Sequence, residues 1–116
     1  MREGGSLFHI CVLLLQEGEW WSAQCLEHDV AVQARSLPEL RTELERVLLL
    51  HVLAALEEGR KPFSEIGPAP GKYWDMFAAA KLRVEGDELP FRLPDAVDFP
   101  PILPRLKIAE VKPAYA

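Results

Sequence analysis

Residues 7–34, LFHICVLLLQEGEWWSAQCLEHDVAVQA, combine three apolar stretches with two polar turns, and this pattern decides the fold class. Residues 7–16 are rich in aliphatic side chains and include a run that is apolar on both faces, which predicts a central strand or one covered on both sides. Residues 17–19, Glu-Gly-Glu, are typical of a tight hairpin turn. Residues 20–26 and 30–34 continue as shorter strands, so the whole segment predicts a β-meander.

A long helix is predicted to follow the meander. Ser36 and Glu39 have the spacing of a capping box, in which the serine oxygen accepts a hydrogen bond from a free backbone N–H and the carboxylate reaches back to the serine's own amide. The apolar pattern continues to Gly59, a residue that commonly follows a helix C-terminus. One side of this helix is apolar at helical spacing and is expected to pack on the sheet. It carries Leu37, Leu40, Leu44, Val47, Leu48, His51 and Ala55.

The C-terminal half of the same helix carries a second apolar set. Its members are Leu49, Leu50, Val52, Leu53 and Leu56. One helix on one face of a sheet would leave this set in water, and a contiguous exposed apolar patch usually marks an interaction site. We therefore expect additional polypeptide to cover it, either the rest of this chain or a second protomer.

The second half of the chain predicts smaller elements. Residues 72–80 form a short amphipathic helix, which offers a cover for the second apolar set, and residues 81–85 form a fourth strand. Six prolines follow residue 86, interleaved with apolar anchors, and residues 106–111 are expected to add an edge strand. We therefore predict an α+β domain over residues 1–86 and a Pro-rich extended arm over residues 87–116, packed on this domain or on a neighbouring protomer.

The fold class predicted by these elements is α+β. It consists of a three- to four-stranded, mainly antiparallel sheet packed on one long helix, with a short second helix and the Pro-rich arm. At 116 residues the chain has the size of one domain, and 49% apolar residues are typical of a globular protein.

The net charge of −5 argues against a nucleic-acid-binding surface, because it gives no basic footprint for phosphates. It favours a basic partner or simple solubility.

Cys11 and Cys25 stand in apolar stretches and are expected to be small buried hydrophobes, not a disulfide. The longest apolar runs, residues 11–15 and 52–56 among them, are too short to span a bilayer, and residues 1–5 lack the form of a signal peptide. We therefore expect a cytoplasmic protein.

No set of catalytic side chains converges in the sequence. An RNase H-type nuclease needs several carboxylates around two metal ions, yet residues 7–15 in the first strand contain none. Glu27, His28 and Asp29 are the only local concentration of ligand-type side chains, and adjacent residues in a turn rarely point the same way. We therefore expect a non-catalytic protein that has no metal and no cofactor. A metal-dependent nuclease is the least favoured alternative.

The stretch from residue 8 to residue 59 resembles the HicB-like antitoxin domain, which has a truncated RNase H-like fold of order β-β-β-α-β. Three features carry this resemblance. First, a glycine precedes an aromatic pair in residues 18–21. Second, the short strand at residues 32–34 ends in a glutamine followed by a small residue. Third, Ser36 and Glu39 open the helix. The resemblance implies a protein that neutralises a small basic toxin and forms homodimers or higher oligomers. Because the prolines after residue 89 exclude a helix pair, we expect a stand-alone member without a DNA-binding domain.

The function predicted from the sequence is therefore protein binding. Trp20 and Trp21 alternate along the second strand, so one ring is expected to be buried and the other exposed or at an interface. The candidate interface residues are Trp20, Trp21, Leu49, Leu53, Leu56, Trp74 and Phe77. The leading hypothesis is a HicB-like, antitoxin-like neutraliser of a small protein. The alternative is a self-associating structural or regulatory protein.

Overall fold

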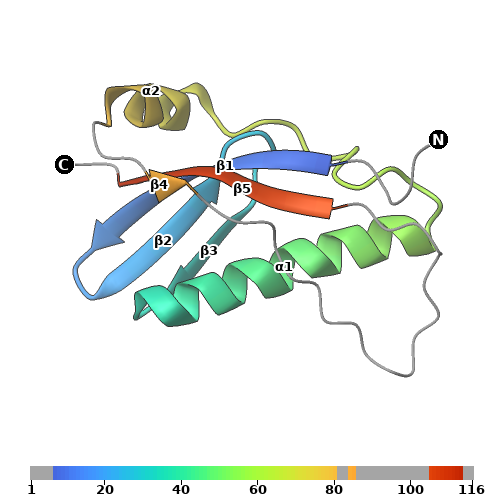
Figure 1. Cartoon of the computed structure of the whole chain (residues 1–116), viewed down its shortest axis with the longest axis horizontal. Coiled ribbons are helices and arrows are strands. Elements are labelled where there is room, and N and C mark those ends of the chain that lie inside the picture. Colours follow the sequence, from blue (N-terminus) through green and yellow to red (C-terminus); the bar gives the residue numbers. More distant parts are fainter. Residues whose placement is uncertain (1–6, 81–83, 86–104, 114–116) are drawn as a thin grey trace.

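The structure is a computed structural model, and it describes residues 7–80, 84–85 and 105–113. In chain order its elements are β1 (Leu7–Glu17), β2 (Trp20–Cys25), β3 (Ala31–Ala34), α1 (Leu37–Glu57), α2 (Gly71–Ala79), β4 (Val84–Glu85) and β5 (Arg105–Pro113). The strands form one sheet in the order β3-β2-β1-β5-β4. Helix α1 covers one face of this sheet and α2 lies on the other, so the fold has three layers (Figure 1).

The sheet is mixed but mainly antiparallel. β1 pairs with β2, β2 with β3, and β4 with β5 in antiparallel register, whereas β1 and β5 are parallel. The predicted α+β fold, with its mainly antiparallel sheet, long helix and short second helix, is confirmed. The sheet has five strands, one more than the three to four predicted. The fourth strand predicted over residues 81–85 corresponds to β4, which pairs with β5.

β1 is the middle strand and is covered on both faces, as its sequence predicts. Ile10 and Val12 point toward α1, where they belong to the larger hydrophobic core. Leu13 points to the opposite face and belongs to a smaller core with Leu26 and Ala69. All three β1 side chains are essentially inaccessible to solvent. The uninterrupted apolar run of β1 therefore serves two cores at once.

β5 lies inside the sheet, which corrects the expectation of an edge strand over residues 106–111. It pairs with β1 on one side and with β4 on the other. The register shifts by one residue between Ile10 and Cys11, so that Ile108 and Val111 both reach the α1 side of the sheet. Strict alternation would place residues three apart on opposite faces, and the irregularity removes this conflict. The rest of the expected arm, residues 87–104 and 114–116, lies outside the described residues.

α1 begins and ends where the sequence predicts. The Ser36 hydroxyl accepts the Glu39 backbone N–H at 3.3 Å, and Gly59 follows the helix with a left-handed φ of 71°. The Glu39 carboxylate accepts a hydrogen bond from the Ser36 hydroxyl at 2.8 Å, instead of reaching the serine amide as expected. The buried side of the helix consists of Leu40, Leu44, Leu48, Val52 and Ala55.

Two residues of α1 were assigned to the wrong side by the sequence pattern. Val52 is buried against the sheet, because it lies four residues after Leu48 and therefore on the same side of the helix. Leu37, expected to pack on the sheet, is 45% exposed. Leu37 belongs to the first turn of α1, and this turn lies beyond the end of β3 (Figure 1).

α2 does not cover the second apolar set of α1, which corrects that expectation. It packs through Tyr73, Met76 and Phe77 against the core on the opposite face of the sheet. Two backbone hydrogen bonds hold the preceding segment near the β2–β3 turn: Ala69 N–H donates to Leu26 C=O at 2.9 Å, and Asp29 N–H donates to Gly67 C=O at 2.8 Å. These contacts lead the chain to the face away from α1. No helix in the described part of the chain has the length and apolar character needed to cross a bilayer.

The depth of burial along α1 can be tested with two leucines of the same helix. Leu48 is 0% exposed and Leu50 is 50% exposed. We expect Leu48→Ala to lower the free energy of unfolding by about 2–5 kcal/mol, because it leaves a cavity between α1 and the sheet. Leu50→Ala should change it by less than about 0.5 kcal/mol. Urea denaturation of both variants measures this difference, and equal destabilisation would contradict the observed packing of α1.

Candidate functional site

The predicted interface residues lie in three separate places. Trp20 stands at the start of β2, beside the first turns of α1. Leu49, Leu53 and Leu56 lie on the C-terminal half of α1, and Trp74 and Phe77 belong to α2 on the other face of the sheet. The structure therefore does not unite these residues into one patch. Each group has to be judged by its own surroundings.

The tryptophan pair divides between the two faces of the sheet, as the alternation predicts. Trp21 is half-buried and packs against the core on the α1 side. Trp20 is 42% exposed, and the guanidinium carbon of Arg35 lies 4.8 Å from the centre of its ring. This cation–π contact places the Arg35 guanidinium over the face of the indole ring. Trp20 is thus the exposed member of the pair.

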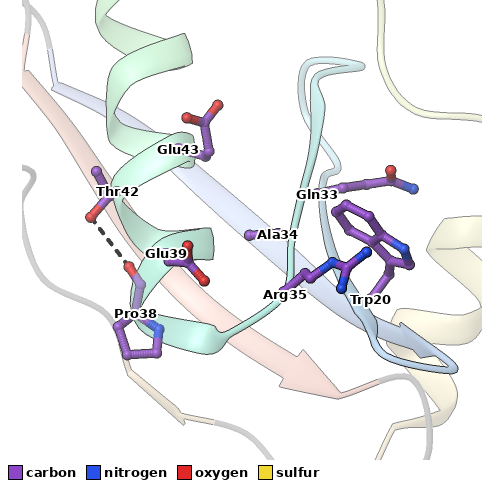
Figure 2. Close-up of a pocket in the computed structure, with 8 residues that line it drawn as sticks. All are labelled: Trp20, Gln33, Ala34, Arg35, Pro38, Glu39, Thr42 and Glu43. Carbon is purple, nitrogen blue, oxygen red and sulfur yellow. Dashed lines mark hydrogen bonds between the residues drawn. The ribbon is translucent and has the colours of Figure 1, made fainter.

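A groove opens next to Trp20, between the end of β3 and the first turns of α1 (Figure 2). Its volume is about 640 Å³. The lining residues are Trp20, Gln33, Ala34, Arg35, Pro38, Glu39, Thr42 and Glu43. The two glutamates have partners already, since Glu39 binds the Ser36 hydroxyl and Glu43 forms an ion pair with Arg46 at 2.8 Å. The groove therefore offers a mostly apolar surface with few uncompensated charges.

The second apolar set of α1 is only partly covered. Leu49, Leu53 and Leu56 are half-buried, and Leu56 packs against the core on the α1 side. Leu50 is 50% exposed, and Ala54, one turn further on, is also exposed. The C-terminal half of α1 therefore presents an apolar strip at its surface, while the opposite side of the same turns is fully packed.

The aromatic residues of α2 mainly anchor this helix. The Trp74 ring is 39% exposed, but its indole N–H donates to Ala69 C=O at 3.1 Å. Phe77 is half-buried in the smaller core, and the Lys112 ammonium lies 4.5 Å from the centre of its ring. The same ammonium donates to Phe77 C=O at 3.3 Å, which ties α2 to β5. Trp74 is the most exposed aromatic residue of α2, whereas Tyr73 and Phe77 are half-buried.

The polar turn after β2 does not form a site, because its three ligand-type side chains have three different partners. The Glu27 carboxylate accepts the Cys11 backbone N–H at 2.7 Å. The Asp29 carboxylate accepts a hydrogen bond from the Gln24 amide at 3.0 Å. Among the described residues, no three His, Cys, Asp or Glu side chains come together in a group that would hold a metal ion.

The third side chain of this turn, His28, belongs to an aromatic cluster that the sequence did not indicate. Its ring stacks on Phe63, with centroids 4.4 Å apart and planes inclined by 14°. Phe8 and His51 contact the same phenyl ring. Burial lowers the pKa of His28, although the nearby Glu27 opposes this shift. Phe63 has a left-handed φ of 64°, a conformation that Gly or Asn would normally signal, so no sequence feature pointed to it.

The two cysteines face opposite sides of the sheet and are free thiols. Burial, together with the adjacent Glu27 carboxylate, raises the pKa of Cys11 to about 12. Burial also raises the pKa of Cys25 to about 12. A thiol is nucleophilic only as the thiolate, so neither cysteine is poised for chemistry.

Both thiols should therefore react slowly in the folded protein. At about pH 8 we expect iodoacetamide to modify Cys11 and Cys25 far more slowly in the native chain than in urea, as followed by mass spectrometry. Because the pKa values are raised only in the folded state, the unfolded chain releases these protons first as the pH rises. Their contribution to stability should be constant below pH 9.0 and should fall between there and about pH 12. Fast labelling of either native thiol would contradict the packing of β1 and β2.

Comparisons with protein-family models, with curated proteins and with solved structures found no match for this chain. The resemblance to the HicB-like domain therefore stays a prediction. The described geometry defines an α+β domain that has a helix on each face of its sheet and several apolar side chains at its surface.

Proposed function

We propose that this chain is a non-catalytic protein-interaction domain of HicB-like type, which binds and neutralises a small basic protein. The observation that carries this proposal is the apolar strip on the C-terminal half of α1, centred on Leu50. Leu50 is half exposed, whereas Leu48 and Val52 on the other side of the same turns are buried. Exposed aliphatic side chains on a rigid helix supply an anchor that a partner can bury at little entropic cost.

The chemistry of the partner follows from the charge of the chain. The net charge of −5 favours a basic protein, because complementary charge steers association and disfavours wrong partners. Glu57 and Glu58 are exposed at the C-terminal end of α1, close to the strip in sequence. A partner that fits this surface has an apolar groove or helix face bordered by lysine or arginine.

A non-catalytic role is supported by the way the polar side chains are used. Glu27 and Asp29 serve backbone and side-chain hydrogen bonds, and His28 is stacked in the aromatic cluster. The acidic residue of β1, Glu17, stands at its hairpin end and is exposed. A nuclease of the RNase H type would need these carboxylates to converge, so the nuclease alternative has no support from this arrangement.

The proposal is tested by co-expressing this chain with the product of the neighbouring gene, which the proposal expects to be a small basic protein. We expect the two chains to co-purify after co-expression and to bind in isothermal titration. Leu50→Asp should weaken binding about 30-fold or more, since loss of a central apolar anchor costs about 2 kcal/mol.

The matched control is Ser64→Asp, which adds the same charge at an exposed position in a loop. This variant should bind like the unmodified chain. Recovery of the chain by itself from co-expression, or equal affinity of the Leu50→Asp and Ser64→Asp variants, would overturn the proposal.

A further inference from the structure

The C-terminal end of α1 carries a charge that does not suit a helix end. The aligned peptide dipoles place a partial negative charge there, so lysine, arginine or histidine is favoured in the last turn. The last turn of α1 holds no basic residue, and its final residue is Glu57. The Glu57 side chain is exposed. A carboxylate at this position weakens the helix that carries it, and we therefore looked for what else it could bind.

Glu57 has no cation of its own among the described residues. Its neighbour Glu58 forms an ion pair with Arg60 at 2.8 Å, and the same guanidinium lies 3.8 Å from the Glu65 carboxylate. Arg60 is thus engaged by two other carboxylates, and no ion pair in the described part of the chain includes Glu57. Of the two exposed glutamates at this helix end, Glu57 is the one whose charge is available to another molecule.

Glu57 lies in line with the apolar strip of α1. It follows Leu50 by seven residues and Leu53 by four, and both spacings return to the same side of an α-helix. At the usual rise per residue, its Cα atom stands about 10 Å along the helix axis from that of Leu50. Ala54 lies between them and is exposed, so its small side chain lets a partner approach the helix closely. Leu50, Ala54 and Glu57 thus form one continuous surface.

The other end of the strip has no such unpaired charge. Arg46, four residues before Leu50, forms an ion pair with Glu43 at 2.8 Å. Arg41 pairs with Glu45 at 2.9 Å. The charged side chains that precede the strip on α1 therefore compensate one another, whereas the carboxylate that follows it is uncompensated. This asymmetry gives the strip a direction along the helix axis.

We propose that Glu57 is the charge-selecting residue of this surface, and that it receives a lysine or arginine side chain of the basic partner. The cation interacts at once with the carboxylate and with the negative end of the α1 dipole. It stands about 10 Å from the apolar group that covers Leu50, which fixes the orientation of the partner along α1. The inference rests on the proposed function and adds the residue that distinguishes a basic partner from other apolar ones.

Two opposite effects of one substitution follow from this role. Removal of the charge should stabilise the free chain, because an unfavourable interaction with the helix dipole is lost. The same removal should weaken the complex, because the cation of the partner loses its carboxylate. A residue that served only the fold would lower stability when replaced and would not select the charge of a partner.

Thermal denaturation and isothermal titration test the inference. In the free chain we expect Glu57→Gln to raise Tm by about 1–5 °C. In binding to the product of the neighbouring gene, Glu57→Lys should raise Kd at least about tenfold, and Glu57→Gln should raise it by a smaller factor. Both losses should shrink as NaCl is raised from about 50 mM to about 500 mM, since salt screens exposed charges.

The matched control is Glu19→Lys, which makes the same change in net charge at an exposed position of the β1–β2 turn. This turn lies near the first turn of α1, at the opposite end of the helix from the strip (Figure 1). The control should weaken binding far less than Glu57→Lys, because it alters the net charge of the chain without touching the strip.

Equal affinities of the Glu57→Lys and Glu19→Lys variants would contradict the inference, and so would a lower Tm of the free Glu57→Gln chain. If Leu50→Asp still weakens binding in either case, the proposed function stands and only the role of Glu57 is refuted. An unmodified chain that does not bind the product of the neighbouring gene refutes the proposed function and this inference with it.

Discussion

β1 carries apolar side chains on both faces, and the whole architecture follows from the need to cover both. Ile10 and Val12 require a layer on one side, which α1 supplies, and Leu13 requires a layer on the other, which α2 supplies. The edges of β1 are also closed, by β2 on one side and by the parallel strand β5 on the other. The burial of one central strand thus fixes the places of both helices and of a segment almost one hundred residues away in sequence.

The parts of the fold that local patterns determine were predictable. The two-sided apolar run of β1, the Ser36 cap and the alternation of Trp20 and Trp21 all follow from the chemistry of a few neighbouring residues. The face chosen by α2 and the internal position of β5 depend on pairing between distant segments, which periodicity does not report. Val52 was misplaced because it was grouped with its sequence neighbours Leu50 and Leu53, although it continues the buried i, i+4 row of Leu44 and Leu48.

The candidate site was harder to predict than the fold. The interface candidates named from the sequence include Leu49, Leu53 and Leu56, and these side chains are half-buried. Leu50, which was not among the candidates, is the exposed leucine of this strip. Phe77 was grouped with them, although it holds α2 in place. No sequence pattern indicated Phe63, which has a left-handed backbone and whose ring contacts those of Phe8, His28 and His51.

The central claim is that β1 is the best-protected strand because it is enclosed on both faces and both edges. Native-state hydrogen exchange, read residue by residue by NMR, tests this claim most directly. The amides of Ile10, Val12 and Leu13 should exchange only through global unfolding, with the highest protection in the chain. Exchange of these amides as fast as those of the hairpin turn at Gly18 would contradict the account, because β1 would then lack the two layers that define the fold.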